Sequence, residues 1–280
     1  MESTICTVGL GQMLVEGGDA RGNLERAARM IREAGDRGCD VVVLPECLDL
    51  GWTHPSARDL AAPIPGPRSD ALAQAARQAG VHVVAGLTER DGSRIYNSAV
   101  LIAPDGGILL VHRKINELTI AHDLYSIGDR LGVARTSFGM VGIDICADNF
   151  PDSLVLAHSL ARMGARIILS PSAWAVDATH DNVRDPYGGL WKGAYARVAL
   201  LYDIPIVGVS NVGWITGGPW QGRKCIGCSL VVGRDGTVLA EGPYGEAAEA
   251  LLVVPVEITP QAAAGTAIAQ MLKSRGYQGP

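Results

Sequence analysis

Short runs of apolar residues alternate with segments of helical periodicity along most of the chain. Short apolar runs bounded by turn residues are typical of buried strands, whereas apolar residues at every third or fourth position are typical of a helix. The pattern predicts strands at residues 5–10, 41–44, 81–87, 140–145, 166–169, 204–210 and 250–256. It also predicts helices at 23–37, with Asn23 as the N-cap, and at 69–78, 152–163 and 190–202.

Turn residues join further apolar runs into two hairpins. Residues 97–103 and 108–112 flank Pro104-Asp105-Gly106-Gly107, and residues 229–232 pair with 238–241 around Arg234-Asp235-Gly236. Glycine tolerates the positive φ that tight turns require. The sheets are therefore expected to be mixed rather than purely parallel.

Similar elements occur in both halves of the chain, and no linker rich in Pro, Ser or charge divides it. This pattern favours an α/β fold in which two sheets pack as a sandwich with helices outside. We expect one domain over residues 1–280, ending in a tail of roughly 259–280 that contains a further helix.

Composition narrows the class of protein. Apolar residues make up 48% of the chain and charged residues 19%, so a sizeable core is expected. The net charge of −5 argues against nucleic-acid binding, which requires a basic surface. No apolar stretch approaches the roughly 20 residues of a membrane helix, and no leader pattern begins the chain. Six Cys are too sparse for a disulfide scaffold, so a cytoplasmic protein with free thiols is expected.

Three reactive side chains follow apolar strands: Glu46 after VVVLP, Lys114 after LLVHR and Cys146 after MVGIDI. Functional groups gather beyond the carboxyl ends of strands in α/β sheets. Taken singly, each has a more common structural interpretation: Glu46 and Lys114 as surface charges, and Cys146 as a small buried hydrophobic residue. Their shared placement is what points to a catalytic site.

The three residue types fit one chemistry. A thiolate is a strong nucleophile, and an ammonium such as that of Lys114 lowers the thiol pKa and stabilises an oxyanion. A carboxylate such as Glu46 can take the thiol proton, pass it to a leaving amine and later activate water. Together they predict cleavage of an amide bond through a Cys146 thioester.

The segments VVVLPECLDLGW, HRKINEL and GIDICADNFPD resemble the three signature motifs of the nitrilase, or carbon-nitrogen hydrolase, superfamily. The resemblance extends over nearly the whole chain. It implies a four-layer α-β-β-α sandwich with two mixed sheets, and a homodimer or higher assembly joined through the outer helices. It also implies Glu46 as general base, Lys114 as transition-state stabiliser and Cys146 as nucleophile.

Departures from the family pattern bear on the substrate. Nitrile-cleaving members usually follow the nucleophile with Trp-Glu, whereas Ala147-Asp148 follow it here. Carbamoylases and several amidases carry Arg four residues after the nucleophile, where this chain has Phe150. A small-carboxamide amidase with the Ala147 backbone N–H in the oxyanion site is the best fit. An N-carbamoyl hydrolase remains as the alternative. A nitrilase or an acyltransferase is less favoured, and a non-catalytic binding protein is disfavoured.

Other candidates are less decided by the sequence. Many members of the family have a second Glu between the Lys and a downstream Gly-Asp, which is Gly128-Asp129 here. Glu117 and Asp123 are candidates for this position, but neither spacing decides the matter, and Glu117 is more often expected on a helical surface. Trp52 and Trp174 fall in loops where they can wall a pocket.

Cofactor and metal sites are not expected. Cys225 and Cys228 form a Cys-x-x-Cys pair without a second pair, so core packing is the better interpretation than zinc. No complete phosphate-binding loop occurs. The predicted partner is a small amide substrate.

Overall fold

The chain forms two six-stranded sheets and a smaller three-stranded one; the computed structural model describes residues 3–260 and 263–279. The first sheet has the order β15-β1-β2-β3-β4-β5, and its strands are β1 (Thr4–Gln12), β2 (Val41–Val43), β3 (His82–Asp91), β4 (Arg94–Ile102), β5 (Ile108–Arg113) and β15 (Ala250–Ile258). The second has the order β14-β13-β10-β8-β7-β6, and its strands are β6 (Val133–Thr136), β7 (Gly139–Ile143), β8 (Ile167–Ser172), β10 (Ile206–Ser210), β13 (Leu230–Val232) and β14 (Val238–Glu241). The small sheet joins β11 (Val212–Trp214), β12 (Lys224–Ile226) and β9 (Ala175–Val176).

Both large sheets are mixed, as the hairpins predicted. In the first, β2 runs parallel to β1 and β3, whereas β3 and β4 are antiparallel. In the second, β8 runs parallel to β7 and β10, and β13 and β14 form the predicted antiparallel hairpin. Parallel strands share one direction, so the carboxyl ends of β2, β7 and β8 can present side chains to a common site.

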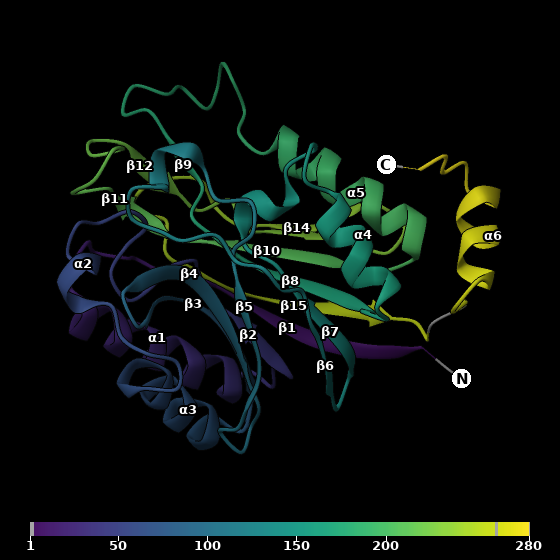
Figure 1. Cartoon of the computed structure of the whole chain (residues 1–280), viewed down its shortest axis with the longest axis horizontal. Coiled ribbons are helices and arrows are strands. Elements are labelled where there is room, and N and C mark those ends of the chain that lie inside the picture. Colours follow the sequence, from purple (N-terminus) through teal and green to yellow (C-terminus); the bar gives the residue numbers. More distant parts are fainter. Residues whose placement is uncertain (1–2, 261–262, 280) are drawn as a thin grey trace.

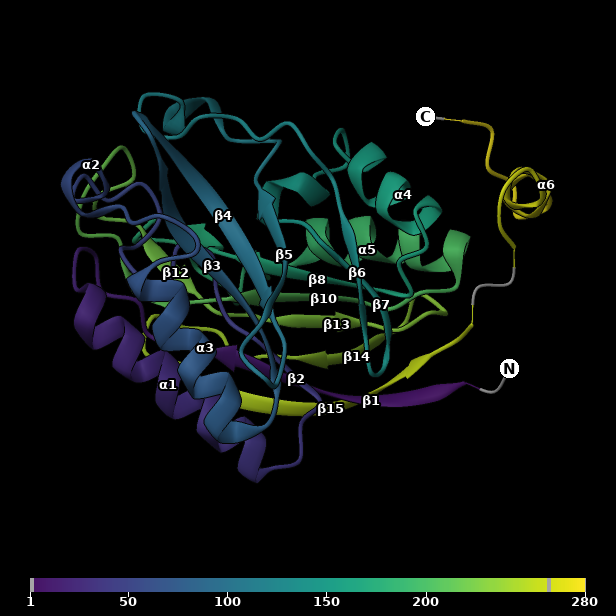
Figure 2. The ribbon, with the colours of Figure 1, turned by 60° about the horizontal axis from the view of Figure 1, so that its bottom comes forward.

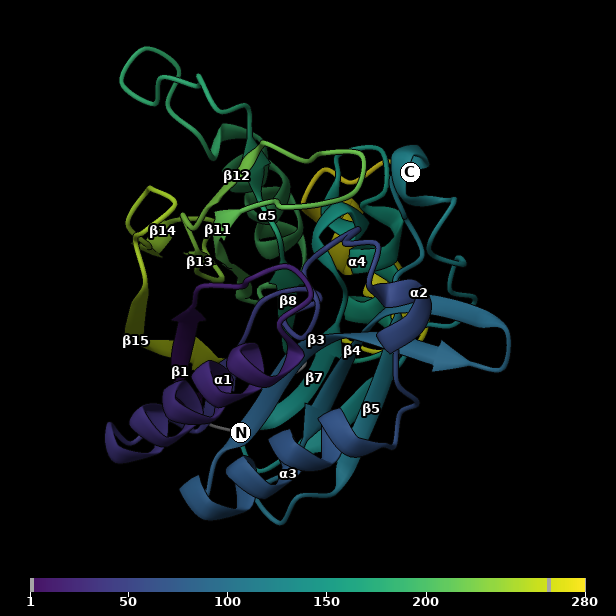
Figure 3. The same ribbon diagram turned by 90° about the vertical axis from the view of Figure 1, so that its left-hand side faces the viewer.

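Helices cover the outer faces of both sheets, which gives the four layers expected (Figures 2 and 3). Helices α1 (Ala20–Asp36) and α3 (Pro67–Ala79) pack on the first sheet, where Ile31 and Leu72 share a core with Val42. Helices α4 (Val155–Arg162) and α5 (Gly189–Tyr202) cover the second sheet (Figure 1). Between the sheets, Val41 and Val43 belong to the same buried cluster as Ile167 and Leu169. Successive residues of β2 thus alternate between two cores.

The expected N-cap at Asn23 is wrong. Helix α1 begins at Ala20, and the side chain of Asp19 accepts a hydrogen bond of 3.0 Å from the Gly22 N–H. Asn23 lies buried in the first turn, where its Nδ2 donates to the carbonyls of Glu16 at 2.7 Å and Asp49 at 3.0 Å. Its side chain therefore links two loops by hydrogen bonds instead of capping the helix.

Some elements go beyond the predictions. Strands β3 and β4 form a long hairpin that reaches the pair Asp91–Arg94, because Gly92 at positive φ closes a two-residue turn. The short helix α2 (Ala57–Leu60) and the 3-10 helices η1 (Thr119–Ala121) and η2 (Cys146–Asn149) lie in loops. The expected tail helix is α6 (Ala267–Ser274), which packs through Ile268 and Leu272. No helix within the described residues is long and apolar enough to span a bilayer.

Candidate active site

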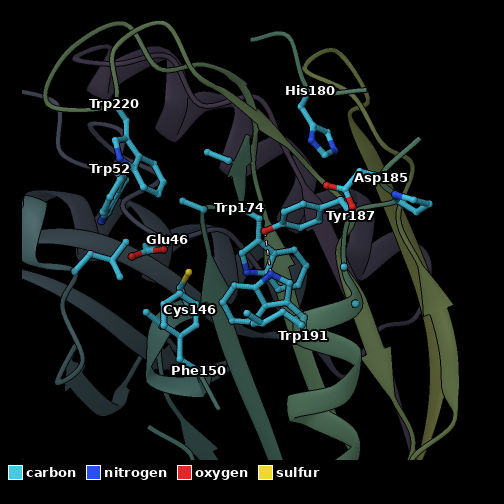
Figure 4. Close-up of a pocket in the computed structure, with 18 of the residues that line it drawn as sticks. Glu46, Trp52, Cys146, Phe150, Trp174, His180, Asp185, Tyr187, Trp191 and Trp220 are labelled. Atoms are coloured by element: carbon cyan, nitrogen blue, oxygen red, sulfur yellow. Dashed lines mark hydrogen bonds between the residues drawn. The ribbon is translucent and has the colours of Figure 1, made fainter. Parts of the chain in front are cut away.

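Glu46, Lys114 and Cys146 line one cavity of about 420 Å³ (Figure 4). Glu46 lies three residues after β2, Lys114 directly follows β5, and Cys146 lies three residues after β7. The structure therefore confirms that these residues gather beyond the strand ends. None of them is a surface residue, since each is at most 9% exposed.

The backbone on both sides fixes Glu46. Its N–H donates 3.2 Å to the carbonyl of Ser172 in β8, and the carbonyl of Pro45 accepts 2.9 Å from the Gly86 N–H in β3. A Cβ on Gly86 would lie 2.5 Å from the Cα of Glu46, so only glycine lets the loop approach β3 this closely. Glu46 Oε1 then accepts hydrogen bonds from Asn97 Nδ2 at 2.6 Å and Lys114 Nζ at 2.7 Å.

Lys114 lies between two carboxylates. Its Nζ is 2.7 Å from Glu46 Oε1 and 3.2 Å from Glu117 Oε2. Burial alone would lower the pKa of Lys114, but the negative charges of Glu117 and Glu46 outweigh it and hold that pKa well above its usual value. The side chain is therefore a fixed ammonium, suited to stabilising negative charge.

Of the two candidates for a second acid, the structure brings only Glu117 to the site. Glu117 is buried, and its Oε1 accepts from Asn97 Nδ2 at 3.3 Å. Burial raises the pKa of Glu117 and Glu46 adds to the rise, although Lys114 opposes them. Asp123 is exposed and does not line the cavity, and its backbone carbonyl accepts from Arg58.

Cys146 begins η2 in a left-handed conformation with φ of 46°. This conformation is costly for a residue with a Cβ and is held in place here by the surroundings. The Cys146 N–H donates 3.2 Å to Ser170 Oγ, which also accepts from Asn149 Nδ2 at 3.2 Å. The Ala147 N–H lies in the first turn of η2, where backbone N–H groups have no partner within the helix.

The expectation that Lys114 lowers the Cys146 pKa is only partly met. Burial raises the pKa of the Cys146 thiol well above its usual value, and the charge of Glu46 raises it further. Lys114 opposes this rise without overcoming it. The resting thiol is consequently neutral, and attack requires a base to remove its proton.

Two positioning residues escaped the sequence reasoning. Asn97, a polar residue within the apolar run of β4, donates to both Glu46 and Glu117. Asp148 is buried and joins the segment after Lys114 to the turn that carries Cys146. The one sign of Asp148 in the sequence is its position, two residues after the candidate nucleophile Cys146.

Asp148 makes this connection through both carboxylate oxygens. Oδ1 accepts from the N–H groups of Ile115 at 3.1 Å and Asn116 at 2.7 Å, and Oδ2 accepts from the Ile145 N–H at 3.0 Å. His112 Nε2 lies 2.8 Å from Oδ2. Burial alone would raise the pKa of Asp148, but the hydrogen bonds, with that of His112 as the largest contribution, lower it overall, so the carboxylate stays ionised.

The remaining sequence candidates also have clear places. Trp52 and Trp174 both line the cavity (Figure 4). Cys225 and Cys228 are buried and form no disulfide, which agrees with core packing. Within the part of the chain that the structure describes, no group of three or more His, Cys, Asp or Glu side chains is arranged to hold a metal ion.

The chain is similar in sequence and in fold to several known proteins. Omega-amidase NIT2 of Xenopus tropicalis is 31% identical over 163 residues, which are 54% of this chain and 58% of that protein. A nitrilase of Pyrococcus abyssi is 38% identical over 225 residues, which are 78% of each chain. The carbon-nitrogen hydrolase structure from Helicobacter pylori G27 shares the fold, with a TM-score of 0.80 at 23% identity, covering 97% of this chain and 92% of that one.

The omega-amidase match spans less than two thirds of that relative's length. The family model described as carbon-nitrogen hydrolase, in contrast, matches residues 7–266, nearly the whole chain. The chain therefore belongs to the carbon-nitrogen hydrolase family.

Proposed function

We propose that the protein is an amidase that hydrolyses small carboxamides through a thioester on Cys146. The observation that carries the proposal is the buried group of Glu46, Lys114 and Cys146 facing one cavity. A neutral thiol, a neighbouring carboxylate and a fixed ammonium supply a nucleophile, a base and an electrostatic stabiliser.

Acylation uses all three groups. Glu46 takes the Cys146 proton as Sγ attacks the carbonyl carbon, and the carbonyl π electrons move onto oxygen. Lys114 Nζ and the Ala147 N–H stabilise that oxyanion. When the tetrahedral intermediate collapses, the C–N bond breaks and Glu46 gives its proton to the leaving nitrogen. Ammonia leaves, and the acyl group remains on Cys146 as a thioester.

Deacylation uses the same groups, with water as the nucleophile and the Cys146 thiolate as the leaving group. Glu46 takes a proton from water as the water oxygen attacks the thioester carbon. The C–S bond breaks, Sγ regains the proton, and the carboxylic acid is released. Glu117 does not have to exchange a proton in either half-reaction; its charge keeps Lys114 protonated, which makes it a positioning residue.

We also propose a homodimer or higher assembly through the outer helices, in a reducing compartment such as the cytoplasm. Exposed apolar side chains lie on or beside α4 and α5, namely Val155, Met163, Leu190 and Leu200. Unpartnered apolar side chains on neighbouring helices are typical of an interface. All six cysteines are free and buried, which fits a compartment that keeps thiols reduced.

The test is ammonia release from a panel of aliphatic and aromatic amides, N-carbamoyl amino acids and nitriles, with carbon dioxide followed in parallel. We expect ammonia without carbon dioxide from the amides, and no turnover by Cys146→Ala. Undiminished turnover by Cys146→Ala would refute the thioester mechanism, and stoichiometric carbon dioxide would identify a carbamoyl hydrolase instead.

A further inference from the structure

Two groups of aromatic side chains face each other across Cys146 (Figure 4). The first group is Trp52 and Trp220, whose ring centroids are 4.9 Å apart in an edge-to-face arrangement. The second is Trp174 and Trp191, which stack with centroids 4.9 Å apart and an interplanar angle of 20°. We call these pairs the first and second aromatic walls.

The second wall is held rigidly. Trp191 Nε1 donates 2.9 Å to Tyr187 Oη, and Phe150 packs against Trp191 with centroids 5.4 Å apart. Trp174 and Trp191 are at most 5% exposed, so packing fixes their rings. A site with fixed flat walls binds a flat group without having to order its own side chains.

The cavity offers little to balance a negative charge. Among the described residues that line it, Lys114 is the only lysine or arginine, and its ammonium is already paired with Glu46 and Glu117. Arg223 contacts Trp220 but does not line the cavity, and it pairs with Asp177 at 2.9 Å.

The mouth of the cavity adds a negative charge of its own. Asp185 lines it and is exposed. His180 also lines the cavity, in the same loop as Asp185. A carboxylate on the acyl group would be desolvated between the walls with no lysine or arginine free to pair with it, which is strongly unfavourable.

From the two walls and this charge balance, we infer that the preferred acyl group carries a planar aromatic ring and no carboxylate. The inference rests on the proposed amidase function and specifies its substrate class. The ring lies between the walls while the amide carbonyl reaches Cys146. The walls come from four separate loops or helices, and of the four rings only Trp52 lies within one of the three signature segments. This specificity therefore depends on the folded site as a whole.

The experiment compares amides of similar length: 3-phenylpropionamide, hexanamide and 3-(4-carboxyphenyl)propionamide, with propionamide as a short reference. Aromatic pairing adds free energy beyond area burial, so we expect kcat/KM for the phenyl amide to exceed that of hexanamide by about threefold to tenfold. The carboxyphenyl amide should react at least about tenfold more slowly than the phenyl amide, because its charge is left unpaired.

A matched pair of tryptophan variants connects this preference to the walls. Trp220 lines the cavity and is only half-buried, so Trp220→Leu should fold; Trp214 is 46% exposed and lies outside the cavity. We expect Trp220→Leu to bring the phenyl-to-hexanamide ratio of kcat/KM close to one. Trp214→Leu should leave that ratio as it is in the unmodified protein.

The outcomes separate the two proposals. Suppose that propionamide gives Cys146-dependent ammonia. The inference is then overturned if kcat/KM for the phenyl amide does not exceed that for hexanamide, or if kcat/KM for the carboxyphenyl amide equals that for the phenyl amide. The amidase function stands in both cases. An unchanged ratio in Trp220→Leu overturns it as well. Absence of Cys146-dependent ammonia from every amide refutes the proposed function, and the inference fails with it.

Discussion

Gly86 sets the position of Glu46, and Gly86→Ala tests that claim. The three atoms nearest to a Cβ at this position all belong to the backbone: the Cα of Glu46 at 2.5 Å, the carbonyl oxygen of Pro45 at 2.7 Å and the amide nitrogen of Cys47 at 2.8 Å. None of these three contacts can be relieved by rotating a side chain. The loop that carries Glu46 must itself move away from β3.

The size of that movement follows from the contacts. An ordinary contact begins near 3.4 Å, so the Glu46 Cα has to move by about 0.9 Å. Overpacking of this kind costs about 1–3 kcal/mol of stability. Displacing a catalytic group by about 1 Å costs about 100-fold in rate, so kcat/KM should fall by about that factor.

The assay measures kcat and KM for ammonia release together with the free energy of unfolding in urea. Gly193→Ala is the matched control, because a Cβ on this exposed helical glycine meets nothing within 4 Å. We expect Gly193→Ala to be as stable as the unmodified protein or more so, with the same kcat. A Gly86→Ala protein with unchanged kcat/KM would refute the reasoning that β3 positions Glu46.

Three further predictions follow from the buried acids. Glu117→Gln should lower kcat by about tenfold or more, because Lys114 loses a counter-charge. Asp123→Asn should leave kcat unchanged, since Asp123 is exposed. A larger loss of kcat in Asp123→Asn than in Glu117→Gln would contradict the placement of the second acid. Asp148→Asn should lower the free energy of unfolding by about 1–3 kcal/mol and lower kcat, since the backbone N–H groups that bind Asp148 lose a charged acceptor. An unchanged free energy of unfolding and an unchanged kcat would show that the hydrogen bonds of Asp148 are dispensable. Burial, with a smaller contribution from Asp148, raises the pKa of Asp144 to about 7 from its usual 3.8. The folded state then holds a proton that the unfolded state releases, so the free energy of unfolding should fall as pH rises from about 4 to 7, by at most about 1.4 kcal/mol per pH unit. Denaturation curves across that range should show a shallower fall for Asp144→Asn, and an identical slope would contradict the assignment.

Local patterns along the chain were sufficient for much of the fold. Apolar runs identified most strands of the two large sheets, and turn residues identified the β4–β5 and β13–β14 hairpins, because strand alternation and turn geometry depend on neighbours in sequence. The same runs showed that Glu46, Lys114 and Cys146 each follow a strand. Parallel strands of one sandwich bring such positions together, so the gathering of these residues was predictable.

Other features depend on contacts between residues distant in sequence. Burial of Glu117 beside Lys114, and exposure of Asp123, follow from how the segment after β5 packs against the first sheet. The hydrogen bonds of Asn97 and Asp148 join separate strands and turns, so local patterns do not predict these contacts, although the acid two residues after Cys146 is itself visible in the sequence.

The electrostatics of the site were decided by tertiary structure as well. The sequence supplied a thiol and a cation, but only the packed structure showed that desolvation of Cys146 exceeds the effect of Lys114. Desolvation depends on everything that surrounds a group in three dimensions. The sequence by itself thus determined which reactive groups are present and which strands carry them, whereas packing decided their charge states, their partners and the shape of the aromatic pocket around them.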